Sequence, residues 1–460
     1  MSHDNVPARL IRSRRAPLPA LALLLGGALV AGCTGSPAHP AHPAKHGPAS
    51  PAPLSAASGC LVPPATCYAP NLFRVAYGIR PLLDSGVDGR GETVTVLAPP
   101  QPPNQPGAGA PTAPATPPPG PAPATTDIRQ DLAAFDRMFR LPAARIQAVT
   151  TQAGAASPWQ VSAGGAQDLE VVHAVAPAAT LRVVSLPATV LDSQATATAD
   201  MIAALRLAVS GTDVASIGWS LGEHFFSPAQ VAELHSILKG AAAQHVTVAA
   251  SSGDDGSVSN SYGGTVVREV SLPASDPLAL AVGGTTLTAN PVTGSYVSET
   301  TWNGATGSFD VTPGASGGGF SHLYPRPAYQ AGVPGIAKMR GVPDVAGDAN
   351  QQGGLPVVLA SGRQSAVNAA PGTSAATALW AGLMALADQD AQRGLGFVNP
   401  ALYRIARSAS YHQAFHDVTT GDNLTLGPVS DGYHAGPGWD PVTGWGSPNA
   451  QVLVPRLARG

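Results

Sequence analysis

The stretch that decides the fold is Val246-Thr247-Val248-Ala249-Ala250, followed by Ser251-Ser252-Gly253-Asp254-Asp255-Gly256. Its first part is a short apolar run with β-branched residues, which predicts a buried strand. Its second part is rich in glycine and aspartate, which favour tight turns. We therefore expect the chain to leave a buried sheet here through a turn that carries carboxylates.

Strands and helices are expected to alternate on both sides of this stretch. The residue patterns predict strands at 93–97, 180–185, 214–219 and 278–282, and helices at 128–139, 197–209, 228–244 and 374–392. Alternation of this kind indicates a parallel sheet with helices on both faces. The predicted fold class is therefore α/β, in a single large domain, with active groups at the carboxyl ends of the strands.

The composition is that of a compact globular protein. The chain has 460 residues, of which 44% are hydrophobic and 12% charged. Its length allows one large domain, or two of average size, with a substantial core. A formal net charge of -3 supplies no basic face. Nucleic acid is therefore excluded as an expected partner.

The N-terminus has the features of an export signal. Arginines between residues 9 and 15 precede an apolar run at 18–30, and Val30-Ala31-Gly32 stands directly before Cys33. The run is too short for an ordinary membrane-spanning helix. The last residues resemble a bacterial lipobox, in which the cysteine carries lipid. We expect residues 1–32 to be a lipoprotein signal peptide and the mature protein to be extracellular, anchored to the cell membrane through Cys33; a plain secretory signal is the alternative.

Two proline-rich segments flank or interrupt the expected domain, which spans residues 60–460. Residues 33–59 predict a solvated tether, and residues 99–123 predict a surface insertion, because neither composition can form a packed core. In an exported protein, Cys60 and Cys67 predict a small disulfide. Two free thiols are the alternative.

The sequence Gly372-Thr373-Ser374-Ala375 stands immediately before the longest predicted helix. A serine at a helix N-terminus can expose its hydroxyl beside unpaired backbone N–H groups, which stabilise an oxyanion. Ordinary N-capping is the alternative. A subtilisin-like enzyme would also need a His-Gly-Thr segment for its base, and the one His-Gly pair, His46-Gly47, lies in the tether.

Short motifs follow one another through the expected domain. They are Tyr68-Ala69-Pro70-Asn71-Leu72, Tyr77-Gly78-Ile79, the acidic segment 168–177, Ser216-Ile217-Gly218-Trp219-Ser220, Ser252-Gly253-Asp254-Asp255-Gly256, Pro273-Ala274-Ser275, the segment 281–287, Gly317-Gly318-Gly319-Phe320-Ser321, Pro343-Asp344-Val345 and Gly372-Thr373-Ser374-Ala375. Taken together and in this order, they resemble the sedolisin family of serine-carboxyl peptidases from about residue 60 to the end of the chain.

The resemblance implies a subtilisin-like parallel sheet and an active site built on carboxyl groups. By position, Ser374 is the implied nucleophile, Asp168 the carboxylate that supports the base, and Asp254 the aspartate that helps bind the oxyanion. The implied function is that of an exported serine-carboxyl-type endopeptidase acting on peptides or unfolded protein. Carboxyl groups suit such chemistry to acidic conditions.

The sequence departs from the family pattern at the base. The catalytic Glu is expected four residues before Asp168, on the same helix face, and that residue is Gly164. Glu170 lies about 200° further around the helix and cannot replace it. Three outcomes remain open: Asp168 acts on Ser374 itself or through water, the local register differs, or the site is impaired. The last would make the protein a peptide-binding surface protein. We also expect no large prodomain, because few residues separate Cys33 from Cys60.

The C-terminal region resembles the family's calcium-binding loop. The resemblance rests on Phe415-His416-Asp417-Val418, Gly436-Pro437-Gly438-Trp439-Asp440 and the segment 443–448. It implies Ca²⁺ bound by the side chains of Asp417 and Asp440 and the main-chain carbonyls of Val418, Gly436 and Gly438. Carboxylate and carbonyl oxygens are the ligands that calcium prefers. The alternative is a glycine-rich loop with two incidental acids.

Overall fold

The structure is a computed structural model that describes residues 67–98, 126–149, 157–187, 190, 193–259, 267–304, 314–351, 353–361, 364–368, 371–424 and 431–460. The predicted signal peptide, the tether and the insertion at 99–123 lie outside these residues. Cys67 is disulfide-bonded, and its predicted partner, Cys60, is outside the described part of the chain. Within that part, no helix has both the length and the apolar character needed to cross a membrane.

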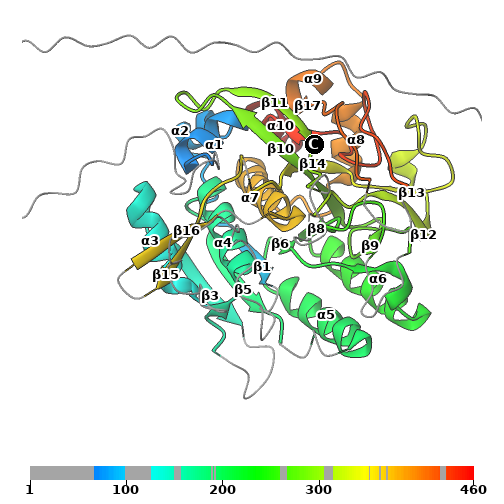
Figure 1. The fold of residues 1–460 in the computed structure, drawn as a ribbon, viewed down its shortest axis with the longest axis horizontal. Coiled ribbons are helices and arrows are strands. Elements are labelled where there is room, and N and C mark those ends of the chain that lie inside the picture. The colour runs from blue at the N-terminus through cyan, green and yellow to red at the C-terminus, as the bar shows by residue number, and fades with distance from the viewer. Residues whose placement is uncertain are drawn as a thin grey trace, which may run out of the picture. The chain divides into compact units, whose positions relative to one another are not determined.

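A mainly parallel eight-stranded sheet forms the centre of the fold (Figure 1). Its path runs β11-β10-β8-β6-β1-β5-β3, and β14 also pairs with β10. The strands are β1 (Thr93–Ala98), β3 (Arg145–Val149), β5 (Thr180–Ser185), β6 (Val214–Ile217), β8 (Thr247–Ser251), β10 (Leu280–Ala289), β11 (Tyr296–Thr301) and β14 (Val345–Asp348). The predicted α/β class with a mainly parallel sheet is confirmed. Among the described strands of this sheet, β10 and β11 pair antiparallel and the other pairings are parallel.

Helices cover both faces of the sheet. One face packs against α1 (Pro70–Ala76), α3 (Ile128–Phe139), α4 (Ala163–Val175), α7 (Thr373–Ala391) and α10 (Ala450–Ala458). The other face packs against α5 (Gln194–Ala208) and α6 (Pro228–Ala243), which lie together below the sheet in Figure 1. Each face thus has its own hydrophobic core, as a doubly covered parallel sheet requires.

Shorter elements complete the described chain. The helices are α2 (Arg80–Asp84), α8 (Asn399–Ala406), α9 (Tyr411–Ala414) and the 3₁₀ turns at Glu223–Phe225 and Ala328–Gln330. The small strand pairs are β2 (Thr126–Asp127) with β4 (Gln160–Val161), β7 (Leu221–Gly222) with β9 (Ser271–Leu272), β12 (Gly319–Pro325) with β13 (Met339–Val342), β15 (Val357–Ser361) with β16 (Gln364–Asn368), and β17 (Phe415–His416) with β18 (Ser447–Pro448).

Local sequence explains where some elements begin, and packing explains others. Helix α6 starts with a capping box, because the Ser227 and Gln230 side chains each bond the other residue's backbone N–H. The sequence predicts that strand β10 ends at Val282, but it continues through Gly283 and Gly284. A Cβ at Gly284 would lie 2.8 Å from Ala349 Cβ and 3.0 Å from the Trp302 ring. These glycines therefore allow close packing and do not form a turn.

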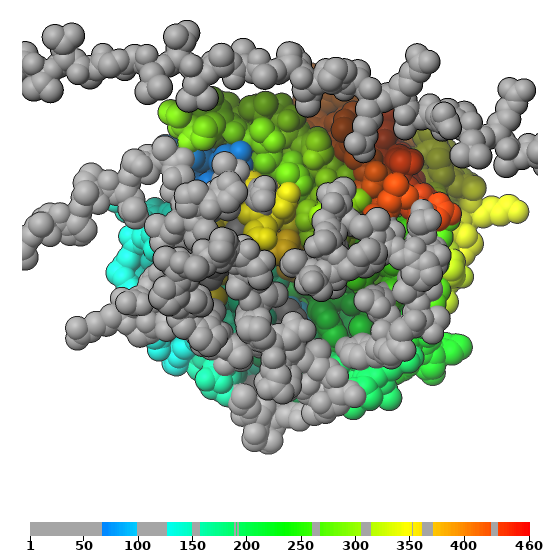
Figure 2. Space-filling view, viewed as in Figure 1, coloured from blue at the N-terminus to red at the C-terminus, as the bar shows by residue number. Residues whose placement is uncertain are grey.

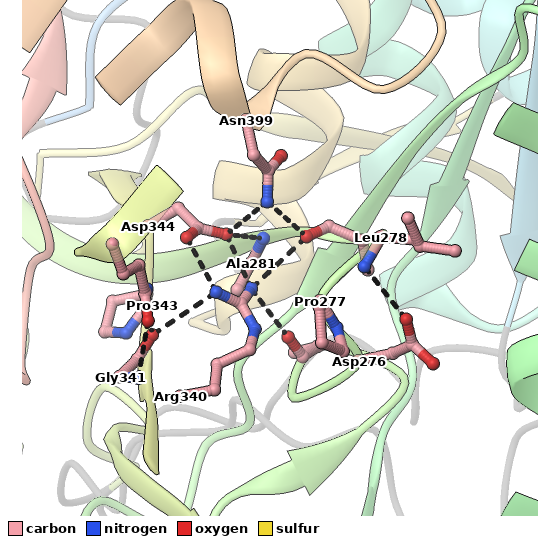
Figure 3. A network of polar contacts seen from close by, with 12 residues as sticks. Asp276, Pro277, Leu278, Ala281, Arg340, Gly341, Pro343, Asp344 and Asn399 are labelled. Atoms are coloured by element: carbon pink, nitrogen blue, oxygen red, sulfur yellow. Dashed lines mark hydrogen bonds and ion pairs between the residues drawn. The ribbon is translucent and has the colours of Figure 1, made fainter. Parts of the chain in front are cut away.

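A buried ion pair joins Arg340 of β13 to Asp344, which directly precedes β14 (Figure 3). Arg340 donates to both carboxylate oxygens of Asp344, at 2.9 and 2.7 Å, and both residues are fully buried. Asp344 also accepts from the Ala281 backbone N–H at 2.9 Å and from Asn399 of α8 at 3.2 Å. Through these hydrogen bonds and the ion pair, the Asp344 carboxylate ties three segments together inside the protein.

The two ends of the described chain meet on one side of the molecule. In Figure 2 the blue N-terminal helices and the orange-red C-terminal segments lie along the upper edge, with the green β10–β11 region between them. The backbone N–H of Ala450, at the start of α10, donates to the carbonyl of Tyr77 at 2.8 Å. This contact attaches the C-terminal helix to the N-terminal helices.

The buried carboxyl groups make the stability of the protein pH-dependent. Burial raises the pKa of Asp388 to about 8 and that of Asp168 to about 7. A group whose pKa is higher in the folded than in the unfolded chain stabilises the fold fully at a pH below its unfolded pKa. This stabilisation is lost as the pH rises through the folded pKa. We therefore expect the melting temperature to fall between pH 6 and pH 8.

The test is a series of thermal unfolding curves across that range. Asp388→Asn should make the decrease smaller, because a tenfold change in proton affinity between the folded and unfolded chains corresponds to about 1.4 kcal/mol. The control is Gly240→Ala on α6, which changes no ionisable group and should leave the slope unchanged. A melting temperature that rises from pH 6 to pH 8 would contradict the expectation.

Candidate active site

Ser374 is the second residue of α7 and is half-buried. The helix begins after Gly372, whose φ of 151° lies in a region that side chains rarely adopt. A Cβ at Gly372 would lie 3.2 Å from Asp254 Oδ2 and 3.6 Å from Ser374 Oγ. The glycine therefore leaves open the space that separates these two side chains.

Asp254 lies in the turn after β8 and holds the start of α7. Its Oδ1 accepts from the Thr373 backbone N–H at 2.8 Å and from the Thr373 hydroxyl at 2.7 Å. The residue as a whole is exposed. Its carboxyl group is nevertheless surrounded by protein, and this burial raises the pKa of Asp254. The hydrogen bonds from Thr373 act in the opposite direction. Its second oxygen, Oδ2, faces Ser374 and is free to carry a proton.

Asp168 approaches Ser374 from α4. A Cβ placed on Gly218, directly after β6, would lie 2.6 Å from Asp168 Oδ2 and 3.0 Å from Ser374 Cβ. Both side chains therefore border the same point, and the missing side chain of Gly218 is what lets them meet. The three predicted catalytic residues lie together at the carboxyl ends of β6 and β8, where a parallel sheet places its reactive groups.

Asp168 is an unusual carboxyl group. It is fully buried, and neither of its oxygens has a hydrogen-bond partner among the described residues. Burial raises its pKa to about 7, and the charge of Asp254 acts in the same direction. Ser374 is close enough to lower the pKa of Asp168 in part, although the two groups do not have the geometry of a completed hydrogen bond. Rotation of the serine hydroxyl would supply the missing donor.

Gly164 lies on the same helix, one turn before Asp168. Helix α4 begins after Ser162, whose hydroxyl accepts from the Gly165 N–H at 3.1 Å. A Cβ at Gly164 would have a single neighbour within 4 Å among the described atoms, Ser162 Oγ at 3.9 Å. The register is therefore the predicted one, and the position has room for a longer side chain. A register shift, which the sequence leaves open, is not observed.

The other polar residues of α4 point elsewhere. Glu170 is buried, and its Oε2 accepts from the Val358 N–H of β15 at 3.0 Å. His173 is buried against Asp136, with Nε2 and Oδ1 2.9 Å apart. The prediction that Glu170 does not serve as the base at Ser374 agrees with these contacts.

A polar cavity of about 190 Å³ adjoins the site. Gly218 and Asp254 border both the cavity and Ser374. Its wall also contains Phe225, Glu269 and Ser271. The volume suits one large side chain, which makes the cavity a place where part of a bound peptide could be held.

The predicted calcium ligands lie close together in the C-terminal loop. Gly438 N–H donates to Asp417 at 3.1 Å, and Gly436 N–H donates to Asp440 at 3.3 Å. The Thr443 hydroxyl lies 2.9 Å from Asp440 Oδ2 and 3.4 Å from the Val418 carbonyl oxygen. Burial, followed by the charges of Asp417 and Asp440, raises the pKa of Tyr411, so both acids lie near one ring. All five predicted ligands are thus brought into one loop, and whether calcium binds there stays a prediction.

The model of the Subtilase family matches residues 155–446 of this chain. This chain belongs to the subtilase family. The matched residues include both predicted aspartates of the active site and Ser374. The resemblance to its serine-carboxyl branch, the sedolisins, is also confirmed by individual relatives.

Three curated relatives of the family show the extent of the similarity. Kumamolisin of Bacillus sp. (strain MN-32) is 36% identical over 308 residues, which cover 64% of this chain and 51% of the relative. Sedolisin of Pseudomonas sp. (strain 101) is 36% identical over 235 residues, covering 50% of this chain and 38% of sedolisin. Human tripeptidyl-peptidase 1 is 30% identical over 276 residues, covering 53% and 43%. The chain therefore aligns with about half of these relatives' length, or less.

A solved structure extends the similarity to most of the fold. Pseudomonas sedolisin, a serine-carboxyl proteinase complexed with two molecules of pseudo-iodotyrostatin, superposes with a TM-score of 0.67 at 26% identity. The alignment covers 85% of this chain and 97% of the sedolisin chain. The subtilisin-like fold predicted from the motifs is confirmed by this match.

Sequence reasoning misses several residues that shape the family site in this chain. The sequence marks Thr373 only as part of the serine motif and gives it no role. In the structure its backbone N–H and its hydroxyl both donate hydrogen bonds to Asp254. Gly218 is predicted as part of a strand, which ends one residue earlier, at Ile217. Glu269 is not singled out, because no motif marks it. Thr373 and Gly218 lie in motifs that carry the family resemblance, whereas Glu269 does not.

The contact at Gly218 predicts a large effect from a single methyl group. In Gly218→Ala the new Cβ would overlap Asp168 and crowd Ser374, so we expect a loss of about 1–3 kcal/mol in the free energy of unfolding. The matched control is Gly240→Ala on α6, where a Cβ would meet nothing within 4 Å. That change should raise stability by about 0.5–1 kcal/mol. Denaturant unfolding measures both, and equal stabilities of the two variants would contradict the described geometry.

Proposed function

We propose that this protein is a serine-carboxyl-type endopeptidase that acts on peptides or unfolded protein. The observation that supports this most directly is the shared position of Ser374, Asp168 and Asp254 around Gly218 and Gly372. A serine at a helix N-terminus, a buried carboxylate beside it and a second carboxyl facing it form a set suited to acyl transfer.

The chemistry would proceed through an acyl-enzyme. Asp168 in its ionised form accepts the proton of the Ser374 hydroxyl, and Oγ attacks the peptide carbonyl. Asp254, protonated at Oδ2, donates a hydrogen bond to the oxyanion, since its Oδ1 is already occupied by Thr373. Protonated Asp168 then gives its proton to the leaving amine. Water repeats the sequence on the acyl group and restores both residues.

A second candidate function is supported by Gly164. Without a Glu at this position, the base at Ser374 is a single carboxylate, and loss of one member of a catalytic set typically costs several orders of magnitude in rate. The protein would then be a catalytically impaired relative that binds peptides at the cell surface. The fold, the cavity and the substrate class would be unchanged.

We also propose an extracellular location with attachment to the cell membrane through lipid on Cys33. This proposal is supported by the arginine-rich start, the short apolar run and the small residues before the cysteine. The disulfide at Cys67 agrees with an oxidising compartment.

The two candidate functions differ in their response to substitution. On a casein-like substrate, Ser374→Ala should abolish hydrolysis, and Asp168→Asn should lower kcat/KM by about 10²–10⁴-fold through loss of the base. Gly164→Glu should increase activity and move it to lower pH, because a Glu–Asp pair can share one proton. Activity that is absent in the native chain and appears in Gly164→Glu would favour the impaired relative.

The pH profile of the native chain tests the role of Asp168 itself. The mechanism needs Asp168 ionised and Asp254 protonated. Because the pKa of Asp168 is about 7 and that of Asp254 is also raised, kcat/KM should pass through a maximum: it rises as Asp168 ionises and falls as Asp254 loses its proton. Activity that is greatest at pH 3–4 in the native chain, and unaffected by Asp168→Asn, would contradict Asp168 as the base.

We further propose that the C-terminal loop binds Ca²⁺ through Asp417, Val418, Gly436, Gly438 and Asp440. Two carboxylates and three carbonyls would provide a hard oxygen set, which fits calcium. Such a site needs no cluster of three acidic, histidine or cysteine side chains, and the described residues contain none. The ion would supply positive charge between the two acids of this loop.

Removal of calcium should lower the stability of the protein. At a calcium concentration 100 times the Kd, binding contributes about 2.7 kcal/mol, so a chelator should reduce the melting temperature measurably. Asp440→Ala should abolish this response, and Asp417→Asn is the milder second variant. Asp422→Asn, in the same region, is the control and should keep the response. A melting curve that a chelator leaves unchanged rules the site out.

A further inference from the structure

Two adjacent glycines near the start of α4 have different surroundings. A Cβ at Gly165 would lie 2.7 Å from Ala98 Cβ of β1, so packing against the sheet excludes a side chain at that position. A Cβ at Gly164 would have a single neighbour within 4 Å among the described atoms, Ser162 Oγ at 3.9 Å. Glycine weakens a helix relative to alanine. Packing within the described part of the chain therefore explains Gly165 and leaves unfilled space at Gly164.

The unfilled space lies on the same helix face as a buried carboxyl group. Asp168 follows Gly164 by one helical turn. The Cα–Cβ bonds of a helix tilt toward its N-terminus, so the Asp168 side chain leaves the helix in the direction of Gly164. Asp168 is fully buried, and neither of its oxygens has a hydrogen-bond partner among the described residues. A buried polar group without a partner is costly, so a ligand that bonds to it would stabilise this site.

A second polar group borders the same space. The Ser162 hydroxyl accepts from the Gly165 N–H at 3.1 Å, and its own O–H remains able to donate. Asp168 is also a donor below neutral pH, because burial raises its pKa to about 7. These two donors and the positive end of the α4 dipole favour a negatively charged acceptor. A carboxylate has the matching charge and enough oxygen acceptors for both donors.

The ionisable groups around α4 agree with a ligand of this kind. Burial is the main reason for the raised pKa of Asp168, and the charge of Asp254 in the turn after β8 adds to it. On α4 itself, Glu170 bonds to β15, and His173 pairs with Asp136 of α3. A carboxylate bound beside Asp168 would act like Asp254 and favour the protonated form of Asp168, so that the two groups hold one proton between them.

We propose that the space beside Gly164 binds a small carboxylic acid, which shares a proton with Asp168 and serves as the second carboxyl group of the base at Ser374. The binding does not depend on the proposed function, whereas the effect on hydrolysis rests on it. The two carboxyl groups accept the Ser374 proton when Oγ attacks the peptide carbonyl, and they return it to the leaving amine. The acid is therefore unchanged at the end of the reaction. A free acid and an acidic side chain of the bound peptide both offer such a carboxyl group.

Binding of propionate tests the site without any need for catalysis. Propionate equals the side chain that a glutamate would place at residue 164. At pH 6 propionate is ionised and Asp168 largely keeps its proton. By titration calorimetry we expect saturable binding to the native chain with a Kd in the millimolar range. Propionamide has the same size and no charge, and it should bind at least about tenfold more weakly.

Two variants show whether the propionate lies beside Gly164. Gly164→Glu attaches the same group covalently and should abolish propionate binding, because its own carboxyl group fills the space. Gly240→Ala is the matched control at another open glycine of a helix, and it should bind propionate as the native chain does. The comparison of propionate with propionamide on the native chain decides the matter even if Gly164→Glu does not fold.

Hydrolysis of two short peptides, identical except for glutamate in one and glutamine in the other, identifies the source of the carboxyl group. If a free acid supplies it, an excess of propionate should raise kcat/KM for both peptides at least about tenfold over the same concentration of sodium chloride, and should have no such effect in Gly164→Glu. If the peptide supplies it, the glutamate peptide should be hydrolysed at least about tenfold faster than the glutamine peptide without propionate.

The remaining outcomes separate this inference from the proposed function. Propionate binding without hydrolysis of either peptide supports the site and refutes the proposed function. Equal affinity for propionate and propionamide, no binding of either, or unchanged propionate binding in Gly164→Glu overturns the site. A rate that rises with propionate equally in the native chain and in Gly164→Glu overturns the role of the bound acid in the base.

Discussion

The close contact between α4 and α7 is the constraint on which the active-site geometry depends. A Cβ at Gly382 of α7 would lie 2.7 Å from Val175 Cβ of α4, so the Val175 side chain packs directly on the backbone of α7. Nearly all of α7 is buried against α4 and the sheet. Because neither helix can shift without opening this core, Asp168 and Ser374 are held at a fixed separation, and the side chains need no bond of their own to stay together.

Burial gives the carboxyl groups of this site their chemical character. Asp254 has two hydrogen bonds to Thr373 and is partly exposed, whereas Asp168 has no partner among the described residues and is fully buried. A carboxylate without donors in a low-dielectric site is a stronger base than aspartate in water. Burial raises the pKa of both acids, so each holds a proton to a higher pH than aspartate in water does. In the proposed mechanism, with Gly164 on its face of the helix, Asp168 carries the base role alone.

The C-terminal loop is connected to the wall of the cavity through a short chain of bonds. The Ser316 hydroxyl donates to the Val442 carbonyl at 2.8 Å and accepts from the Gly284 N–H at 2.9 Å. Val442 follows Asp440 by two residues and donates its N–H to that carboxylate at 2.8 Å. Gly317, next to Ser316, lines the cavity. An ion bound in the loop would therefore stabilise both the C-terminal segment and one side of the place where peptide is expected to bind.

The sequence by itself determined the local elements and the order of the motifs. Helix 128–139 and strand 180–185 have the predicted bounds, and α6 begins with a capping box formed by two residues three apart in the chain. Such features depend on neighbours within a few residues, so the sequence carries them directly. The family motifs identified Ser374, Asp168 and Asp254 as one set of site residues. These residues are far apart in the sequence, so their spacing does not show that they lie together.

Tertiary structure alone decided which groups touch and how they ionise. The continuation of β10 through Gly283 and Gly284, the bond between Asp254 and Thr373, and the placement of Glu269 against Gly222 all join segments far apart in the chain. The raised pKa of Asp168 has the same origin, since it comes from burial by several elements at once. These properties depend on the packing of the whole fold, and no local pattern of residues records them.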